Sequence, residues 1–236
     1  MRVLFVGNSH TYFNDMPHTF ARLCAAAGAG QPQTVLLAHS ARPLGWHLEE
    51  YFELRYNLLY GGYDYCVIQQ QAHPFPGEEE TARDCGRIIG LCRAAGARPV
   101  LLMTWAERAA PEHQQAMTRA YRGLAASTGA LLAPVGEIWQ QLRRERPEIE
   151  LFWRDGEHAS PLGDYLVAVT LCAVLTGADP EALPGLGADF AGEAEIAFFD
   201  HPRVREDPAC IETRLDPAAC AAIRRAVKRA CAAEAP

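Results

Sequence analysis

Residues 2–11 read RVLFVGNSHT, an apolar run that stops at a glycine and a polar turn. A continuous apolar run of this length is typical of a strand that is covered on both faces of its sheet. In open parallel sheets, ligands bind just beyond the carboxyl ends of the strands. The turn after Val6, with Ser9 inside it, therefore lies where a functional site is expected.

The rest of the chain alternates short strand-like runs with longer helical stretches. We expect strands at Arg2–Val6, Thr34–Ala38, Tyr65–Gln69, Pro99–Met103 and Ala130–Ala133. We expect helices at Met16–Ala27, Trp46–Leu59, Glu78–Ala95, Pro111–Ser127, Val135–Glu145, Pro161–Leu175 and Pro217–Ala233. Repetition of strand, helix and strand implies an α/β fold with a parallel sheet and right-handed crossovers.

The length of 236 residues is ordinary for one α/β domain with its own core. We therefore expect a single domain over residues 1–236. Between about residues 177 and 214, repeated glycine and proline predict an irregular appendage that is too short to build a second core. A terminal helix at about residues 216–233 is expected to follow it.

Composition narrows the class of protein. The chain is 49% hydrophobic and 22% charged, and its net charge of -7 gives no basic surface for nucleic acid or an anionic membrane. It contains no apolar stretch of signal-peptide or membrane-spanning length. Its eight cysteines are scattered without a Cys-x-x-Cys pair, which favours buried thiols in a reducing compartment. We expect a cytoplasmic protein without a nucleic-acid or membrane partner.

Two segments far apart in the sequence carry the residue types of a hydrolytic triad. Ser9 follows the first strand, and Asp155-Gly156-Glu157-His158 occupies a polar turn before a helix expected to begin at Ser160-Pro161. A serine hydroxyl becomes a useful nucleophile when an imidazole takes its proton, and a carboxylate fixes the tautomer of that imidazole. Ser9, His158 and Asp155 are therefore the candidate nucleophile, base and orienting acid.

Further candidates follow other strand ends. Gln69, Gln70 and Gln71 end the third strand, and an amide there can donate to a developing oxyanion. Gly45 follows the second strand and can bring a backbone N–H to the same oxygen. Trp105 follows the fourth strand. Each feature taken alone also fits an ordinary polar loop or a helix start.

Taken together, these pieces resemble the SGNH (GDSL-like) hydrolase superfamily. The nucleophile block is matched by Gly7-Asn8-Ser9, the glycine block by Gly45, the third block by Gln69–Gln71, and the last block by Asp155-x-x-His158. The resemblance is strongest to a branch that reads Gly-Asn-Ser-x-Thr-Tyr, with Thr104-Trp105 after the fourth strand and Ser160, Gly163, Tyr165 and Leu166 in the helix after the last block. It covers about residues 2 to 176.

The resemblance implies a three-layer α/β/α sandwich with a central parallel sheet, flavodoxin-like in form, and a serine esterase activity. The implied substrate is a carboxylester of a short acyl group, plausibly acetyl, on a carbohydrate or small metabolite. The implied oxyanion donors are the N–H groups of Ser9 and Gly45 and the amide of Gln71 or, failing that, Gln69. Asn8 and Trp105 are placed beside them as oxyanion or substrate-binding residues. The Gly-x-Asn-Asp of the family's third block is absent, so the amide donor passes to a glutamine by inference.

Three alternatives stay open. An acyltransferase with the same triad, or a non-catalytic binding domain on the same fold, has the same sequence pattern. A metalloenzyme is disfavoured because the chain lacks His-Glu-x-x-His, although several histidines, including His10, His39, His47 and His73, fall near the predicted strand ends. We expect no metal and no organic cofactor, since the acyl group rests on serine between half-reactions. The sequence does not specify the oligomeric state.

Overall fold

The computed structural model describes residues 1–185 and 215–233, and these form two compact units. The first unit comprises residues 1–11 and 32–137, and the second contains residues 12–31 and the described part of residues 138–236. The prediction of a single domain over the whole chain stays a prediction.

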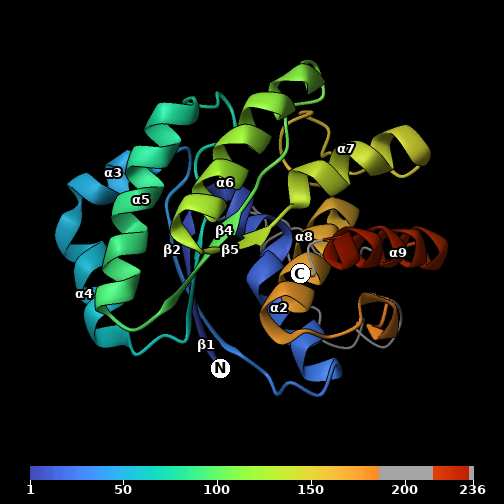
Figure 1. The fold of residues 1–236 in the computed structure, drawn as a ribbon. Coiled ribbons are helices and arrows are strands. Elements are labelled where there is room, and N and C mark those ends of the chain that lie inside the picture. Colours follow the sequence, from blue (N-terminus) through green and yellow to red (C-terminus); the bar gives the residue numbers. More distant parts are fainter. Residues whose placement is uncertain (186–214, 234–236) are drawn as a thin grey trace, which may run out of the picture. The chain divides into compact units, whose positions relative to one another are not determined.

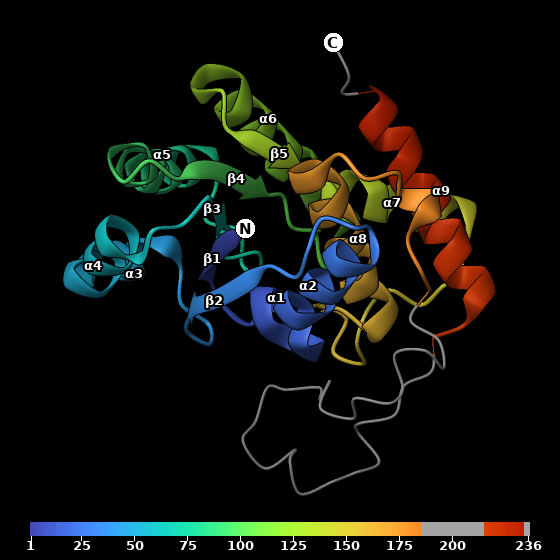
Figure 2. The ribbon, with the colours of Figure 1, turned by 90° about the horizontal axis from the view of Figure 1, so that it is seen from below.

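The first unit is built on a five-stranded sheet in which every neighbouring pair is parallel (Figures 1 and 2). Its strands lie in the order β2-β1-β3-β4-β5. They are β1 (Arg2–Gly7), β2 (Gln33–Ala38), β3 (Tyr65–Ile68), β4 (Arg98–Leu102) and β5 (Leu131–Ala133). All five predicted strands are confirmed to within two residues at each end.

Strand register decides which residues meet at the carboxyl edge of the sheet. Val6 of β1 pairs with Leu37 of β2 on one side and with Ile68 of β3 on the other. The residues that follow, Gly7 and Gln69, are therefore brought to the same edge. Residues Val3–Val6 are fully buried, as expected for a strand covered on both faces.

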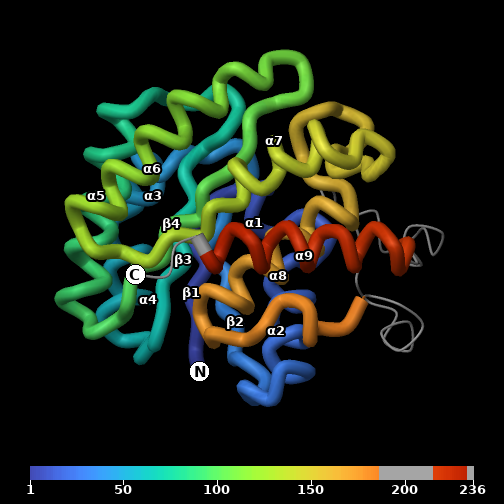
Figure 3. The backbone as a smooth tube through the Cα atoms, turned by 45° about the vertical axis from the view of Figure 1, so that its right-hand side comes forward, coloured from blue at the N-terminus to red at the C-terminus, as the bar shows by residue number. Residues whose placement is uncertain are grey.

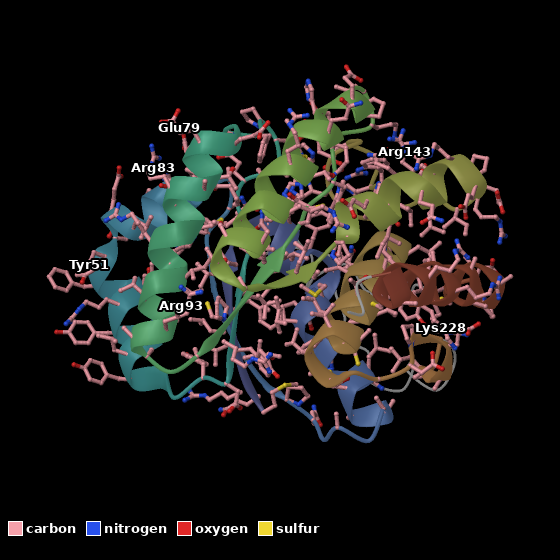
Figure 4. The ribbon with its side chains drawn as sticks, in the orientation of Figure 1. Tyr51, Glu79, Arg83, Arg93, Arg143 and Lys228 are labelled. Carbon is pink, nitrogen blue, oxygen red and sulfur yellow. The ribbon has the colours of Figure 1, made fainter. Side chains whose placement is uncertain are left out.

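Helices of the first unit pack on this sheet and on one another. They are α3 (Leu44–Glu49), α4 (Tyr51–Gly61), α5 (Glu78–Ala94), the 3-10 turn η2 (Pro111–His113) and α6 (Gln114–Thr128). Helix α5 contacts α3, α4 and α6, and its side chains Glu79 and Arg83 extend outward (Figure 4). Arg93, near the other end of α5, donates to the Thr128 carbonyl at the end of α6.

The prediction of one helix over Trp46–Leu59 is wrong. The chain forms two helices, because Glu50 adopts ψ 47° and leaves the helical region between them. The first helix also begins two residues earlier than predicted, at Leu44, whose N–H donates to Gln70 Oε1 at 2.9 Å. This bond joins residues 26 positions apart, so local propensity gives no signal of it.

The second unit is helical, with α8 (Pro161–Thr176) packed between α2 (Met16–Ala26) and α9 (Pro217–Ala233) (Figure 3). It also holds the 3-10 turns η1 (Phe13–Asp15) and η3 (Pro180–Ala182), and most of α7 (Val135–Glu145). Helix α8 is buried almost all round, which its nearly unbroken apolar sequence predicts. All of these helices except the two short turns were predicted, with ends that agree to within one residue.

The predicted appendage at residues 177–214 is described only in part. Within the predicted appendage the structure describes η3, while residues 186–214 lie outside the described part of the chain. Seven cysteines lie in the described ranges, all of them free thiols and six of them buried, as predicted. Cys210 falls outside those ranges. None of the helices in the described ranges is long and apolar enough to cross a membrane.

Candidate active site

Ser9 stands at the first position of α1 (Ser9–Tyr12), a short helix that directly follows β1 and was not predicted. Asn8 caps this helix, because its Oδ1 accepts a hydrogen bond from the His10 N–H at 3.1 Å. The other end of the Asn8 side chain donates to the Arg42 carbonyl at 3.2 Å. Ser9 itself is 6% exposed. The two hydrogen bonds of the Asn8 side chain therefore hold the helix start at which Ser9 lies.

Gln69 holds this turn from the neighbouring strand end. Its Oε1 accepts the Asn8 N–H and the Thr11 hydroxyl, both at 2.9 Å. Gly7 permits this approach, because a Cβ there would lie 2.4 Å from both Gln69 Oε1 and Thr11 Oγ1. The sequence suggested that Gly7 provides a sharp exit from the strand. The structure gives another reason for glycine at this position, because Gln69 and Thr11 approach its backbone too closely for a side chain.

The carbonyl of Gly7 is anchored on its other side. It accepts a hydrogen bond from His47 Nε2 at 2.8 Å and another from the His39 N–H at 3.2 Å. Burial lowers the pKa of His47, and this outweighs the opposite effect of its bond to Gly7. The imidazole is therefore a neutral donor at physiological pH that holds the end of β1 in place.

The three glutamines after β3 have different partners. Gln70 is fully buried, and its Oε1 accepts from the N–H groups of Leu44 and Gln71, both at 2.9 Å. It thereby joins the end of β3 to the start of α3. Gln71 is half-buried, and its Nε2 donates to the His73 carbonyl at 3.2 Å.

Gly45 is the second residue of α3, where a backbone N–H has no helical carbonyl to bond. A Cβ at this position would lie 3.2 Å from Asp84 Oδ2, which is tighter than ordinary contact. Asp84 itself is buried, and its Oδ1 accepts from Arg83 Nε at 2.8 Å. Glycine is therefore favoured here by the approach of a carboxylate from α5.

Trp105 follows β4, as predicted, and its ring is fully buried. It packs near the imidazole of His10, with ring centroids 5.5 Å apart. Its carbonyl lies 3.0 Å from His73 Nε2. In the first unit, the structure thus brings Asn8, Gln69 and Trp105 together around the segment that carries Ser9, and Gln71 is hydrogen-bonded to its neighbours Gln70 and His73.

Asp155 and His158 lie in the second unit and form a pair within one turn. His158 Nδ1 is 2.7 Å from Asp155 Oδ2, and the other carboxylate oxygen accepts from the N–H groups of Glu157 and His158 at 2.9 and 3.0 Å. Gly156, with φ 77°, provides the left-handed residue that the turn requires. The carboxylate thus shapes the turn and orients the imidazole.

The chain on either side closes this turn like a short hairpin. The Trp153 N–H donates to the His158 carbonyl at 2.8 Å, and Phe152 forms an antiparallel bridge with Ala159. Ser160 then caps α8, as predicted, because its Oγ accepts the Gly163 N–H at 3.1 Å. The pair is therefore held between a bridge and a helix start.

Side chains from η1 support the same turn. The ring of Phe13 stacks on the His158 imidazole with centroids 4.6 Å apart. Asn14 Nδ2 donates to the Ala159 carbonyl at 3.0 Å and to Asp164 Oδ2 at 2.5 Å. Burial raises the pKa of Asp164 well above its usual range, against the lowering effect of Asn14.

Asp155 has the opposite protonation behaviour. Its partial burial alone would raise the pKa of the carboxyl. The hydrogen bonds from the Glu157 N–H, the His158 side chain and the His158 N–H outweigh that effect, and the pKa is lowered. Asp155 is therefore ionised at neutral pH, as an orienting carboxylate must be.

The described residues contain no group of three or more His, Cys, Asp or Glu side chains arranged to hold a metal ion. Sequence reasoning did not single out Gln70 and Asn14. Three successive amides at a strand end were the available signal for Gln70. No sequence signal marked Asn14, whose left-handed backbone at φ 50° and contacts with residues 145 and 150 positions away appear only in the fold.

The chain is similar in fold to several solved structures. A DUF4886 family protein from Bacteroides uniformis shares 15% identity, covers 98% of this chain and 95% of its own, and has a TM-score of 0.62. An acetyl xylan esterase from Geobacillus stearothermophilus shares 13% identity over 74% of this chain and 94% of its own, with a TM-score of 0.61. The psychrotrophic esterase EstA from Pseudoalteromonas sp. shares 14% identity over 75% of this chain and 97% of its own, with a TM-score of 0.56.

No protein-family profile and no curated protein sequence matches the chain. The likeness is therefore one of fold, and other solved structures in the same group are described as members of the G-D-S-L family. This confirms the three-layer α/β class with a central parallel sheet that the sequence resemblance implied. The chain has the fold of the SGNH (GDSL-like) hydrolases.

Proposed function

We propose that this protein is a serine esterase in which Ser9 is the nucleophile, His158 the base and Asp155 the orienting acid. The observation that carries the proposal is the hydrogen bond of 2.7 Å between His158 Nδ1 and Asp155 Oδ2. A carboxylate on Nδ1 fixes the tautomer in which Nε2 accepts a proton. The lowered pKa of Asp155 keeps its charge available to stabilise the imidazolium.

The reaction then follows the two half-reactions of a serine hydrolase. The Ser9 hydroxyl proton passes to His158 Nε2 while Ser9 Oγ attacks the ester carbonyl. The tetrahedral intermediate expels the alcohol, which takes the proton from His158. Water, deprotonated by His158, next attacks the acyl-serine, and the acid leaves as Ser9 recovers its proton. No metal or organic cofactor is needed in this scheme.

The oxyanion of each tetrahedral intermediate is assigned to the N–H groups of Ser9 and Gly45 and to the amide of Gln71. Between the two candidate glutamines, Gln71 is favoured because both ends of the Gln69 amide are engaged, its Oε1 by Asn8 and Thr11 and its Nε2 by the Gln70 carbonyl. Replacing Gln69 would therefore disturb the turn that carries Ser9. Gln71 Nε2 donates one of its two hydrogens to the His73 carbonyl, which leaves the second hydrogen for an oxyanion.

For the substrate we propose a carboxylester with a short acyl group, acetyl above all, on a carbohydrate or small metabolite. The similarity in fold to an acetyl xylan esterase supports this choice. The buried free thiols support a reducing, cytoplasmic location.

The proposal is tested by hydrolysis of p-nitrophenyl acetate together with labelling by an organophosphonate. We expect ester hydrolysis that survives prolonged dialysis against EDTA, and one phosphonyl adduct per chain, located on Ser9 by peptide mass spectrometry. An inert protein without an adduct would contradict the proposed activity. Activity lost with EDTA and restored by a divalent metal would contradict the metal-free mechanism.

A further inference from the structure

A chain of hydrogen bonds behind Ser9 is not used by the proposed mechanism. His10 Nε2 lies 3.1 Å from His73 Nδ1, and His73 Nε2 lies 3.0 Å from the Trp105 carbonyl. The two imidazoles meet edge to face, with centroids 4.9 Å apart, and both are almost completely buried. The chain thus joins α1 to the segments that follow β3 and β4.

The acceptor at one end fixes where the protons lie. A carbonyl oxygen can only accept, so His73 Nε2 carries a hydrogen and donates to Trp105. In neutral His73 the other ring nitrogen, Nδ1, then holds a lone pair. His10 Nε2 must therefore donate to it, which places both rings in the Nε2–H tautomer.

Charged groups lie beyond His73. Glu107 Oε2 is 3.8 Å from His73 Nε2, and the other oxygen of Glu107 is 2.8 Å from Nδ1 of His113, which lies in η2. One added proton on the imidazole pair keeps a single hydrogen between the facing nitrogens, and Glu107 offsets the charge. A second proton places two N–H groups and two positive charges against each other at 3.1 Å, so the bond is lost.

We propose that His10 and His73 are positioning residues that share one hydrogen between their facing nitrogens and so hold the helix that carries Ser9. The inference rests on the proposed role of Ser9. It adds a requirement that the Ser-His-Asp scheme lacks: the pair must not be doubly protonated. Hydrogen bonds of this kind contribute about 1 kcal/mol, or roughly a fivefold to tenfold change in rate when lost.

The direct test is long-range ¹H–¹⁵N NMR of the imidazoles in the full chain, with His10→Gln and His73→Gln used for assignment. At pH 8 we expect both rings as Nε2–H tautomers. On acidification both should respond in the same first step, because they take up one proton together. A Nδ1–H tautomer in either ring, or two unrelated midpoints, would overturn the inference whatever the protein's activity.

Kinetics supply a second test, by the rate at which an organophosphonate labels Ser9. His10→Leu should label about tenfold more slowly, whereas His10→Gln keeps a donor facing His73 and should stay near the wild-type rate. In acid, the wild-type rate should fall more steeply than the His10→Gln rate, because only the wild-type pair can take up a second proton and lose its bond. The matched control is His18→Gln, which alters a partly exposed imidazole in α2, outside the pair and its charged neighbours, and should keep the wild-type profile.

The outcomes separate the two proposals. A wild-type chain that forms no adduct on Ser9 contradicts the proposed function, while the NMR tautomers still decide the existence of the pair. A wild-type chain that labels normally, with His10→Leu equal to it in rate and pH profile, contradicts the positioning role and leaves the esterase proposal standing.

Discussion

The segment that carries Ser9 and the turn that carries His158 are held in place in opposite ways. Segment Gly7–Thr11 is buried and bonded to residues distant in sequence, such as Gln69 and His47. Turn Asp155–His158 is partly exposed, and its shape comes from bonds between residues two and three positions apart. The proposed nucleophile is therefore positioned by a whole sheet edge, and the proposed acid–base pair by a single turn.

This difference has a consequence for substitutions. Changes far from Ser9 in the sequence, at the end of β3 or in α3, should displace the nucleophile. Changes outside the turn should leave the bond between Asp155 and His158 largely intact. Substitutions in each region therefore test this contrast.

The largest effect is expected for Ser9→Ala. Loss of the nucleophile should lower kcat for p-nitrophenyl acetate by several orders of magnitude, while the fold is kept, since the hydroxyl does chemistry and little packing. The matched control is Ser40→Ala, an exposed serine in the same unit. Retention of more than about a tenth of the wild-type rate would rule out Ser9 as nucleophile.

The next effect separates the two members of the turn. His158→Ala should cost about a thousandfold or more in kcat, and Asp155→Ala less, because the base moves the proton and the carboxylate only orients it. Asp155→Asn keeps an acceptor for the Glu157 and His158 N–H groups and so tests the charge without opening the turn. A greater loss for Asp155→Ala than for His158→Ala, at unchanged stability, would show that the roles are assigned wrongly.

The third prediction compares two glutamines at one strand end. Gln71→Ala should lower kcat by about a hundredfold with little change in KM, because an oxyanion bond strengthens in the transition state. Gln69→Ala should instead lower the free energy of unfolding by about 1–3 kcal/mol, since the buried Asn8 N–H loses its acceptor. Urea unfolding and steady-state kinetics on both variants check this. A Gln71→Ala variant with full kcat would leave a backbone-only oxyanion hole.

The smallest effect on catalysis is expected at Asp164, which acts on stability. Its raised pKa means that the folded protein keeps a proton which the unfolded chain loses above about pH 4. The free energy of unfolding should therefore fall as pH rises from there to the raised pKa, by at most about 1.4 kcal/mol per pH unit. Asp164→Asn should remove this fall in thermal or urea unfolding.

Asp179 provides the control with the opposite sign. The bond to Lys228 lowers the pKa of this exposed carboxyl, so any stability it contributes is present above about pH 4 and is lost as pH falls through the lowered pKa. Asp179→Asn should leave the fall at higher pH unchanged. If Asp164→Asn does not alter the pH dependence, Asp164 is not the buried acid described above.

Much of the fold could be predicted from the sequence, because its signals are local. Continuous apolar runs marked the strands, and Ser160-Pro161 marked the start of α8. The break at Glu50, where ψ leaves the helical region, could not be predicted, since the residues on both sides favour helix. The start of α3 at Leu44 was missed because its bond to Gln70 joins distant residues. The four-residue helix at Ser9 was also missed, although Asn8 is a favoured capping residue.

In the candidate site too, local contacts could be predicted and contacts between distant residues could not. The Asp155–His158 geometry follows from a spacing of three residues and was expected. The long-range hydrogen bonds of Gln69, Gln70 and His47 could not be predicted. Each joins residues at least 26 positions apart, which only the folded sheet brings together. The meeting of Ser9 with His158 stays a prediction.

Activation of Ser9 by His158 can be tested by a crystal structure of the protein after reaction with an organophosphonate. We expect a covalent bond from phosphorus to Ser9 Oγ, with His158 Nε2 about 3 Å from that oxygen and Asp155 still bonded to Nδ1. An adduct on another residue, or His158 Nε2 more than about 5 Å from Ser9 Oγ in the adduct, would contradict it.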